Sequence, residues 1–354
     1  MLKPFVILAM LSIPASTFAA APLFDSQATL SLTIEAPMRV LVRKRLDKPQ
    51  FDAIVTWTDE SGESGVLAAK LSPRGNARLA ACDFPPLRLE FDRDATRGTP
   101  FEGRKRLKMV THCGAGTAKR AWLWQEYGIY RAYNAITEYS YRVRMLDVSY
   151  EDSKSRRWRR RSPAFLIEPT SEVAARLGMH AIEPEQVRDA QFNRPETANN
   201  LLFQYLIGNT DFAVKKGPSG ETCCHNGRVI APEQSSDGWV VLPYDYDQAG
   251  IINTSYALPD ERLSIRRVTS RYYRGFCWQN DLLPDTIARF NEQRQAIATA
   301  LVPEALSAGK QKRAKRYIDR FYEIVNDSRE LGKRLTSKCR GAAAFSISKT
   351  RTEQ

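Results

Sequence analysis

Apolar and polar positions alternate along the first third of the chain, with the period of a β-strand that buries one face. The segments with this alternation are 39–42, 53–57, 66–71, 87–91 and 107–110. Turn-forming residues separate them, and the Gly- and Ser-rich stretch 59–65 predicts a hairpin. We therefore expect an antiparallel, β-rich layer, preceded by an extended lead-in over 23–35.

After residue 118 the apolar period changes to that of a helix. Trp122, Glu126, Tyr130 and Tyr133 share one side of a helix predicted over 119–137. The remaining predictions are strands at 142–150, 164–167, 228–230 and 239–244, and helices at 170–177, 196–207, 284–301 and 311–331. The second of these helices has the clearest end, because glycine and asparagine follow it directly.

The N-terminus has the three parts of a secretory signal peptide, which we place at 1–20. These parts are a basic start at Lys3, an apolar core over 5–13 and small residues over 17–21. The core is shorter than the roughly 20 residues that span a membrane, and no later segment reaches that length. We therefore expect an exported protein without a transmembrane segment, periplasmic in a Gram-negative bacterium. The predicted mature part is one domain over 21–340, followed by a disordered tail over 341–354.

Cysteine usage agrees with export, because six cysteines form an even set of the kind found in oxidising compartments. They are Cys82, Cys113, Cys223, Cys224, Cys277 and Cys339. We expect a bond between Cys82 and Cys113, with the other four joining the middle of the chain to its C-terminal part. A zinc site is the weaker interpretation, because Cys223-Cys224-His225 has no second Cys-x-x-Cys motif to complete it.

The chain carries a formal net charge of +13. Outside the cytoplasm, this excess suits an anionic polymer, a lipid or a phosphorylated ligand better than nucleic acid, and no nucleic-acid-binding motif accompanies it. Six cations and Trp158 lie in the segment Lys154–Arg161, which we place in a loop between two strands. This loop is either a binding site for an anionic envelope polymer or a solvated hairpin tip.

Two carboxylates follow the apolar run that ends at Tyr244. Residues two apart in a strand point to the same face, so Asp245 and Asp247 would share one space. A hard cation such as Mg²⁺, Mn²⁺ or Ca²⁺ would offset their repulsion, and a solvated Asp-rich turn is the alternative. The nucleophile elbow, the H-E-x-x-H zinc motif, the P-loop and the G-x-G-x-x-G fingerprint are all absent from the sequence.

Short motifs follow one another in order from about residue 70 to residue 252. The first are Arg74-Gly75-Asn76, Pro86-Leu87-Arg88-Leu89-Glu90-Phe91, Leu107-Lys108-Met109-Val110 and Phe165-Leu166-Ile167-Glu168. The later ones are Gly208-Asn209-Thr210-Asp211, His225-Asn226 and Leu242-Pro243-Tyr244-Asp245-Tyr246-Asp247. This series resembles the CotH-like atypical kinase family, and the chain looks like a divergent exported member. The resemblance implies an α+β, atypical protein-kinase-like two-lobe fold, with a β-rich N-lobe over about 36–168 and a more helical C-lobe over about 169–340.

The resemblance also implies ATP and either Mg²⁺ or Mn²⁺, with cofactor-binding roles for three residues. Lys108 would contact the phosphates, Glu168 would hold that lysine in place, and Arg74 would clamp phosphate through two hydrogen bonds. The alternative is that Lys108 points outward from a half-exposed strand and that Glu168 is only its ion-pair partner.

The catalytic and metal-binding roles fall on the second half of the chain. Asp211 would be the base that orients the acceptor hydroxyl, and its alternative role is a loop cap. Asn226 and Asp245 would bind the metal, with Asp247 as a second ligand or a support. In ordinary kinases the metal-binding Asn follows the base by about five residues, so 215–224 must be an insertion here.

The expected function is an exported, metal-dependent phosphotransferase that acts on an unknown protein or envelope acceptor. One alternative is a non-catalytic protein of the same fold that binds anionic cell-surface polymers through Lys154–Arg161. The other is an exported, metal-dependent phosphoester hydrolase that uses the same pair of aspartates.

Overall fold

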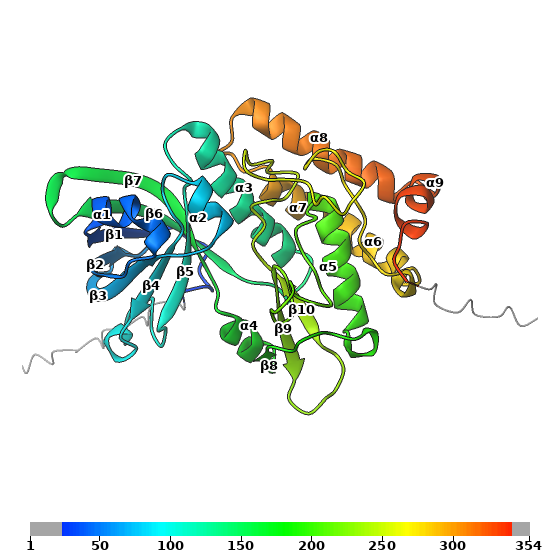
Figure 1. The fold of residues 1–354 in the computed structure, drawn as a ribbon, viewed down its shortest axis with the longest axis horizontal. Coiled ribbons are helices and arrows are strands. Elements are labelled where there is room, and N and C mark those ends of the chain that lie inside the picture. The colour runs from blue at the N-terminus through cyan, green and yellow to red at the C-terminus, as the bar shows by residue number, and fades with distance from the viewer. Residues whose placement is uncertain (1–22, 342–354) are drawn as a thin grey trace, which may run out of the picture.

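The computed structural model describes residues 23–341, which fold around two β-sheets with helices packed beside them (Figure 1). The predicted signal peptide over 1–20 lies outside the described residues, as does the predicted tail apart from Gly341. Within the described range, no helix has the length and apolar character needed to cross a membrane.

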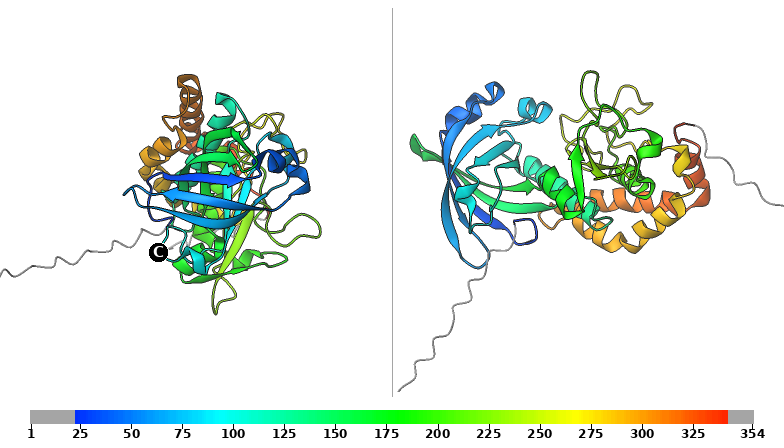
Figure 2. Two further views of the ribbon diagram at one scale, coloured as in Figure 1. Left: turned by 90° about the vertical axis from the view of Figure 1, so that its left-hand side faces the viewer. Right: turned by 90° about the horizontal axis from the view of Figure 1, so that it is seen from below.

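Seven strands close into a barrel on one side of the molecule (Figures 1 and 2). They are β1 (Leu30–Ala36), β2 (Phe51–Thr58), β3 (Ser64–Pro73), β4 (Leu87–Phe91), β5 (Arg106–Thr111), β6 (Val143–Asp152) and β7 (Ser155–Ile167). β1 to β5 pair in sequence as antiparallel neighbours, β7 lies between β5 and β6, and parallel pairing of β6 with β1 closes the barrel. Leu32, Val55, Leu71, Leu89 and Leu146 belong to its buried core, which explains the alternating sequence pattern.

The second sheet and the longer helices lie beyond one end of the barrel (Figure 2). The sheet has the antiparallel order β10-β9-β8 and consists of β8 (Met179–Ile182), β9 (Gly227–Pro232) and β10 (Val240–Pro243). The α-helices are α1 (Met38–Arg43), α2 (Ala77–Ala81), α3 (Thr117–Asn134), α4 (Thr170–Arg176), α5 (Arg194–Ile207), α6 (Leu283–Glu292), α7 (Arg294–Leu301), α8 (Ala308–Val325) and α9 (Ser328–Leu331). Short 3₁₀ or π-helical turns are η1 (Arg45–Asp47), η2 (Asp94–Thr96), η3 (Asp189–Gln191), η4 (Cys277–Gln279) and η5 (Gly332–Thr336).

Helix α3 joins the two sides through one continuous core (Figure 1). The ring of its Tyr130 lies 5.8 Å from Phe165 of β7 and 4.9 Å from Tyr246, which follows β10. All three rings are buried, so that α3, the barrel wall and the end of β10 are held at fixed positions. The candidate site lies where these three elements meet.

The atypical-kinase-like two-lobe fold is wrong. The strands up to Ile167 form a closed barrel instead of one lobe of a kinase, because β6 returns to pair with β1 in parallel. On the other side, the chain adds its own three-stranded sheet and a long irregular connection after β10. Alternation along a strand predicts that strand but not its partner, so barrel closure was not visible in the sequence.

Three local predictions also need correction. Residues 39–42 form part of α1, in which Met38 and Leu41 are buried at helical spacing. The basic segment Lys154–Arg161 is not a loop, because β7 begins at Ser155 and pairs with β6 at Ser155 and from Arg159 onward, with a register shift between these pairs. The helix predicted over 284–301 is interrupted at Gln293, which separates α6 from α7.

All six cysteines lie in disulfides. The predicted bond between Cys82 and Cys113 is confirmed. The expected link between the middle of the chain and its C-terminal part is wrong, because Cys223 pairs with Cys224 and Cys277 pairs with Cys339. Disulfides on this scale are typical of proteins that fold in oxidising compartments.

Candidate functional site

A cavity of about 390 Å³ opens where the barrel, α3 and the second sheet meet. Its walls come from the turn between β3 and α2, from α3, and from the segments before β9 and after β10. Five predicted site residues line it, although they come from distant parts of the chain: Arg74, Asp211, Asn226, Asp245 and Asp247. We call this space the aspartate cavity.

The loop that carries Asp211 begins where α5 ends. Gly208 adopts the left-handed conformation at φ 65° and ends the helix, as glycine commonly does at this position. The side chain of Asn209 then accepts a hydrogen bond of 3.0 Å from the main-chain N–H of Asp211. The loop therefore holds Asp211 at the wall of the aspartate cavity.

Three neighbouring side chains hold the carboxylate of Asp211. Its Oδ1 lies 2.7 Å from Nε2 of His225, and its Oδ2 accepts from Nδ2 of Asn226 at 2.9 Å and from Nε2 of Gln248 at 2.6 Å. The hydrogen bond to Asp211 raises the pKa of His225. A carboxylate has about four acceptor positions, so one position remains open on Oδ1.

The two aspartates after β10 reach the cavity by a turn and not by the strand pleat that we expected. β10 ends at Pro243, and Asp245 has φ 62°, a left-handed conformation that Asp tolerates better than most residues. The main-chain N–H of Asp245 donates to the hydroxyl of Tyr130 at 3.0 Å. Oδ2 of the buried Asp247 accepts from the hydroxyl of Tyr256, also at 3.0 Å.

The carboxylates of the cavity are crowded. Burial, together with the nearby carboxylates of Asp245 and Glu126, raises the pKa of Asp247 to about 8 against the opposing effect of Arg78. The repulsion between these negative charges favours either a proton or a cation beside them. Without a bound cation, the raised pKa of Asp247 therefore favours its protonated form.

A buried ion pair that the sequence did not reveal lies beside these aspartates. Arg78 of α2 and Glu126 of α3 are joined at 2.5 Å, and Arg78 also donates to the main-chain carbonyl of Thr111 at 2.8 Å. Both side chains line the aspartate cavity. The only available signal was Glu126 itself, an acidic residue on the otherwise aromatic side of its helix.

Tyr244 contacts two cations, of which Arg228 lines the aspartate cavity, whereas Lys108 is not among its lining residues. The Nζ atom of Lys108 lies 4.8 Å from the centre of the Tyr244 ring, and the guanidinium of Arg228 lies 4.9 Å from it. Burial, together with the positive charges of Arg74 and Arg228, lowers the pKa of Lys108 to about 8. No ion pair among residues 23–341 involves any of these three cations.

Glu168 is not brought to Lys108. Its carboxylate accepts two hydrogen bonds from Arg176, at 3.2 and 3.1 Å, and one of 2.9 Å from the main-chain N–H of Arg142. These contacts tie the end of β7 to α4 and to the start of β6. Glu168 therefore has a structural role in this arrangement. Tyr244 lies beside Lys108, at the position that we predicted for Glu168.

The basic segment on β7 is partly neutralised by its own hairpin. Arg159 pairs with Glu151 at 3.4 Å, and Arg161 pairs with Asp147, both acids lying on β6. The guanidinium of Arg160 lies 5.0 Å from the ring centre of Trp158. Binding of an anionic polymer by this segment stays a prediction.

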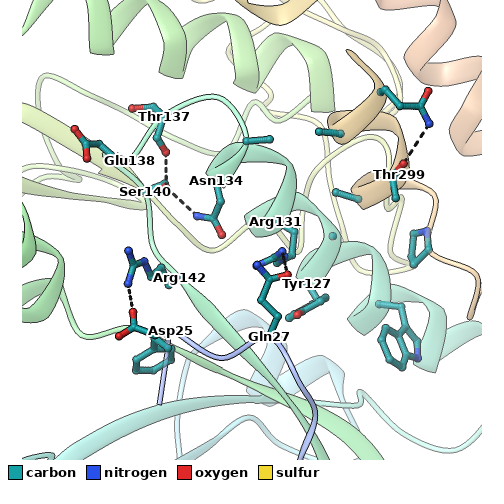
Figure 3. Close-up of a pocket in the computed structure, with 18 of the residues that line it drawn as sticks. Asp25, Gln27, Tyr127, Arg131, Asn134, Thr137, Glu138, Ser140, Arg142 and Thr299 are labelled. Carbon is teal, nitrogen blue, oxygen red and sulfur yellow. Dashed lines mark hydrogen bonds and ion pairs between the residues drawn. The ribbon is translucent and has the colours of Figure 1, made fainter. Parts of the chain in front are cut away.

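A larger cavity, of about 1060 Å³, lies against another part of α3 (Figure 3). Arg142 pairs there with Asp25, and Arg131 donates to Gln27 at 2.6 Å, so that both cations already have partners from the N-terminal segment. Its neutral hydroxyl and amide groups also bond to one another, as Ser140 and Asn134 do at 2.8 Å. The aspartate cavity is therefore the better candidate for charge-dependent chemistry.

The oxygen donors of the aspartate cavity suit a metal ion that is bound partly by the protein and partly by the phosphates of a substrate. Within residues 23–341, no group of three or more His, Cys, Asp and Glu side chains is arranged to hold a metal ion. Mg²⁺ is usually bound in proteins by one or two carboxylates together with substrate phosphates. Asp245 and Asp247, with the amide oxygen of Asn226 nearby, match that smaller set.

Comparison of the sequence with known proteins finds neither a matching family model nor a matching curated protein. The resemblance to the CotH-like family therefore stays a prediction. Function has to be argued from the geometry of the cavity.

Proposed function

We propose that this protein is an exported phosphotransferase that depends on Mg²⁺ or Mn²⁺ and has its active site in the aspartate cavity. One observation carries the proposal: Arg74 and Arg228, which have no carboxylate partner among residues 23–341, line the same cavity as the crowded carboxylates of Asp245 and Asp247. The cations lack an anion to neutralise them, and the crowded carboxylates lack a cation. A phosphorylated ligand with a divalent cation satisfies both.

The cationic side suits phosphate. Arg74 and Arg228 line the cavity, and Lys108 is held beside it by Tyr244. Guanidinium groups bind phosphate through paired hydrogen bonds, and phosphoryl transfer relies on such cations to neutralise the charge of the transferred group. A volume of about 390 Å³ is also in the usual range for small-molecule sites.

Asp211 is the proposed base. Its bonds to His225, Asn226 and Gln248 fix the direction of the carboxylate, and the open position on Oδ1 can accept the hydrogen of an acceptor hydroxyl. The hydroxyl oxygen then bonds to the terminal phosphorus of the donor, while the bond from that phosphorus to the leaving oxygen breaks. The acceptor proton passes to Asp211.

Asp245 and Asp247, with Asn226, would hold the metal ion. The side-chain N–H₂ of Asn226 donates to Asp211, which leaves its amide oxygen as the available ligand. When bound, the metal supplies positive charge to the phosphate oxygens. In this arrangement Asp247 loses the proton that it carries in the metal-free protein.

A thermal-shift series tests the proposal. The full chain is heated with ATP, ADP, AMP or inorganic phosphate, each with and without Mg²⁺ or Mn²⁺. We expect the melting temperature to rise with a di- or triphosphate plus metal, because a ligand that binds only the folded state stabilises it. No shift with any combination would overturn the proposal.

Product analysis separates transfer from hydrolysis. With γ-labelled ATP and an envelope extract, a transferase places the label in an acceptor, and Asp211→Asn abolishes that transfer. Release of the label to water alone, at an undiminished rate when extract is omitted, would indicate a phosphoester hydrolase.

A further inference from the structure

A second hollow, separate from the aspartate cavity, is lined by residues of α3, of the connection after β10 and of helix α8. It has a volume of about 780 Å³. Five cations line it, and within the described part of the chain no Asp or Glu does: they are Arg271, Lys310, Arg313, Arg316 and Arg320. We call this hollow the basic groove.

Most of these cations have no anionic partner. Among the ion pairs of residues 23–341, only Arg320 takes part, through Glu323 at 2.8 Å and Glu330 at 3.7 Å. Arg271 donates to main-chain carbonyls and stacks on the ring of Tyr317 at 3.8 Å. Burial lowers the pKa of Lys310, and the charge of Arg313 lowers it further. Positive charge is therefore concentrated in the groove and left unsatisfied by the chain.

We propose that the basic groove binds an acidic peptide segment of a partner protein. Charge complementarity favours an anionic occupant, because five cations and, among residues 23–341, no carboxylate line the space. Trp122, Ile251 and Tyr317 also line it, and they offer contacts to the apolar side chains of a peptide. An inorganic polyanion has no groups for those contacts.

The groove has a suitable length for such a segment. Lys310 and Arg320 are ten residues apart on α8, which corresponds to about 15 Å along the helix axis. An extended peptide covers that distance with roughly five residues. A short run that combines Glu or Asp with apolar residues therefore matches the row of cations.

The groove adjoins the aspartate cavity through one short stretch of chain. Asp247 and Gln248 line the cavity, whereas Gly250–Asn253 line the groove. A peptide bound here lies next to the cavity, whatever reaction occurs there. The proposal does not depend on phosphotransfer, and it is tested by binding alone.

The test uses a fluorescein-labelled octapeptide of alternating Glu and Leu, titrated with the full-length protein and followed by fluorescence anisotropy. The variant carries Arg313→Glu and Arg316→Glu, both exposed positions in the groove. The matched control carries Lys312→Glu and Lys315→Glu, which make the same change in charge on the same helix outside the groove. We expect the groove variant to bind roughly tenfold more weakly or worse, and the control to bind within about twofold of the unchanged protein.

Two further probes decide between a specific site and general attraction. The peptide with Gln in place of Glu should not bind, and inorganic polyphosphate should compete only weakly. Equal loss of binding in both variants, or binding of polyphosphate without binding of the Glu peptide, would overturn the proposal. Unchanged circular dichroism and melting temperature of the groove variant show that it remains folded.

Discussion

Arg78 and Glu126 form a buried ion pair at 2.5 Å that joins helix α2 to helix α3 beside the aspartate cavity. Their side chains are 9% and 3% exposed. The pair adjoins Asp247, on whose pKa the charges of Arg78 and Glu126 act in opposite directions. The charge balance of the site and the stability of the fold therefore depend on the same contact.

Removal of one partner of this ion pair should destabilise the folded protein. Glu126→Ala leaves the buried guanidinium of Arg78 without a counter-charge, and we expect a loss of about 3–5 kcal/mol in the free energy of unfolding. Urea denaturation measures it. As a control, Asp319→Ala removes a partner of the exposed Lys315, and it should cost no more than about 1 kcal/mol.

Replacement of both partners distinguishes the charge effect from lost packing. Arg78→Met with Glu126→Leu removes both charges together, so most of the stability should return. If the double variant is as unstable as Glu126→Ala alone, then packing, and not the unpaired charge, accounts for the loss.

The elevated pKa of Asp247 predicts a pH dependence of stability. Asp247 has a pKa of about 8 in the folded protein, whereas an unfolded Asp has a pKa near 3.9. Its contribution to stability is therefore complete below about pH 4 and is lost as the pH rises to about 8. Melting temperatures in EDTA from pH 5 to 8 should fall less steeply for Asp247→Asn. Parallel curves would show that Asp247 is already ionised.

Tyr244 should act on ligand binding through the two cations that it holds. Tyr244→Leu removes the ring beside Lys108 and Arg228, and the loss of two cation–π contacts should weaken ADP–Mg²⁺ binding by roughly tenfold. Tyr244→Phe keeps the ring and should bind nearly as well as the unchanged protein. Equal losses in titration calorimetry would assign the effect to the hydroxyl instead.

The disulfides should differ in their effects on function. Cys82 follows the helix that carries Arg78, and Cys113 follows the strand that carries Lys108, so this bond ties two segments of the site. Replacing both cysteines by Ala should cost about 2–5 kcal/mol and also weaken nucleotide binding.

The other long-range disulfide supplies the matched control. Cys277 and Cys339 close a longer segment within the C-terminal part. Their replacement by Ala should lower stability by a similar amount and leave nucleotide affinity unchanged. If both double variants bind equally well, the first disulfide has no special role at the site.

Local sequence signals predicted most of the individual elements. The strand at 87–91 has the observed bounds, and the helix predicted over 196–207 ends where expected, at Gly208. The same signals did not predict the barrel, because the pairing of β1 with β6 joins Leu30 to Leu146 and is set by tertiary packing. Nor did they predict α1, since its apolar residues fit a short strand equally well.

The candidate site was predictable only in part. Polar residues that follow a helix or strand pointed to Asp211 and Asp245, and both line one cavity. The contact of Glu168 with Lys108 was expected only from the family resemblance, whereas in the structure Glu168 pairs with Arg176 at 3.1 Å. Arg78 carried no local signal, because its partner Glu126 is distant in the sequence.

The central claim is that Asp245 binds a metal ion together with a phosphorylated ligand, and calorimetric titration with a non-hydrolysable ATP analogue tests it most directly. The unchanged protein and Asp245→Asn are each titrated with and without Mg²⁺. We predict that Mg²⁺ strengthens binding to the unchanged protein by at least roughly tenfold and has little effect on the variant, because Mg²⁺ is held by one or two carboxylates with the phosphates. Without Mg²⁺, the variant should bind at least as well, since it has lost a negative charge. The same gain from Mg²⁺ in both proteins, or no binding to either, would contradict the account.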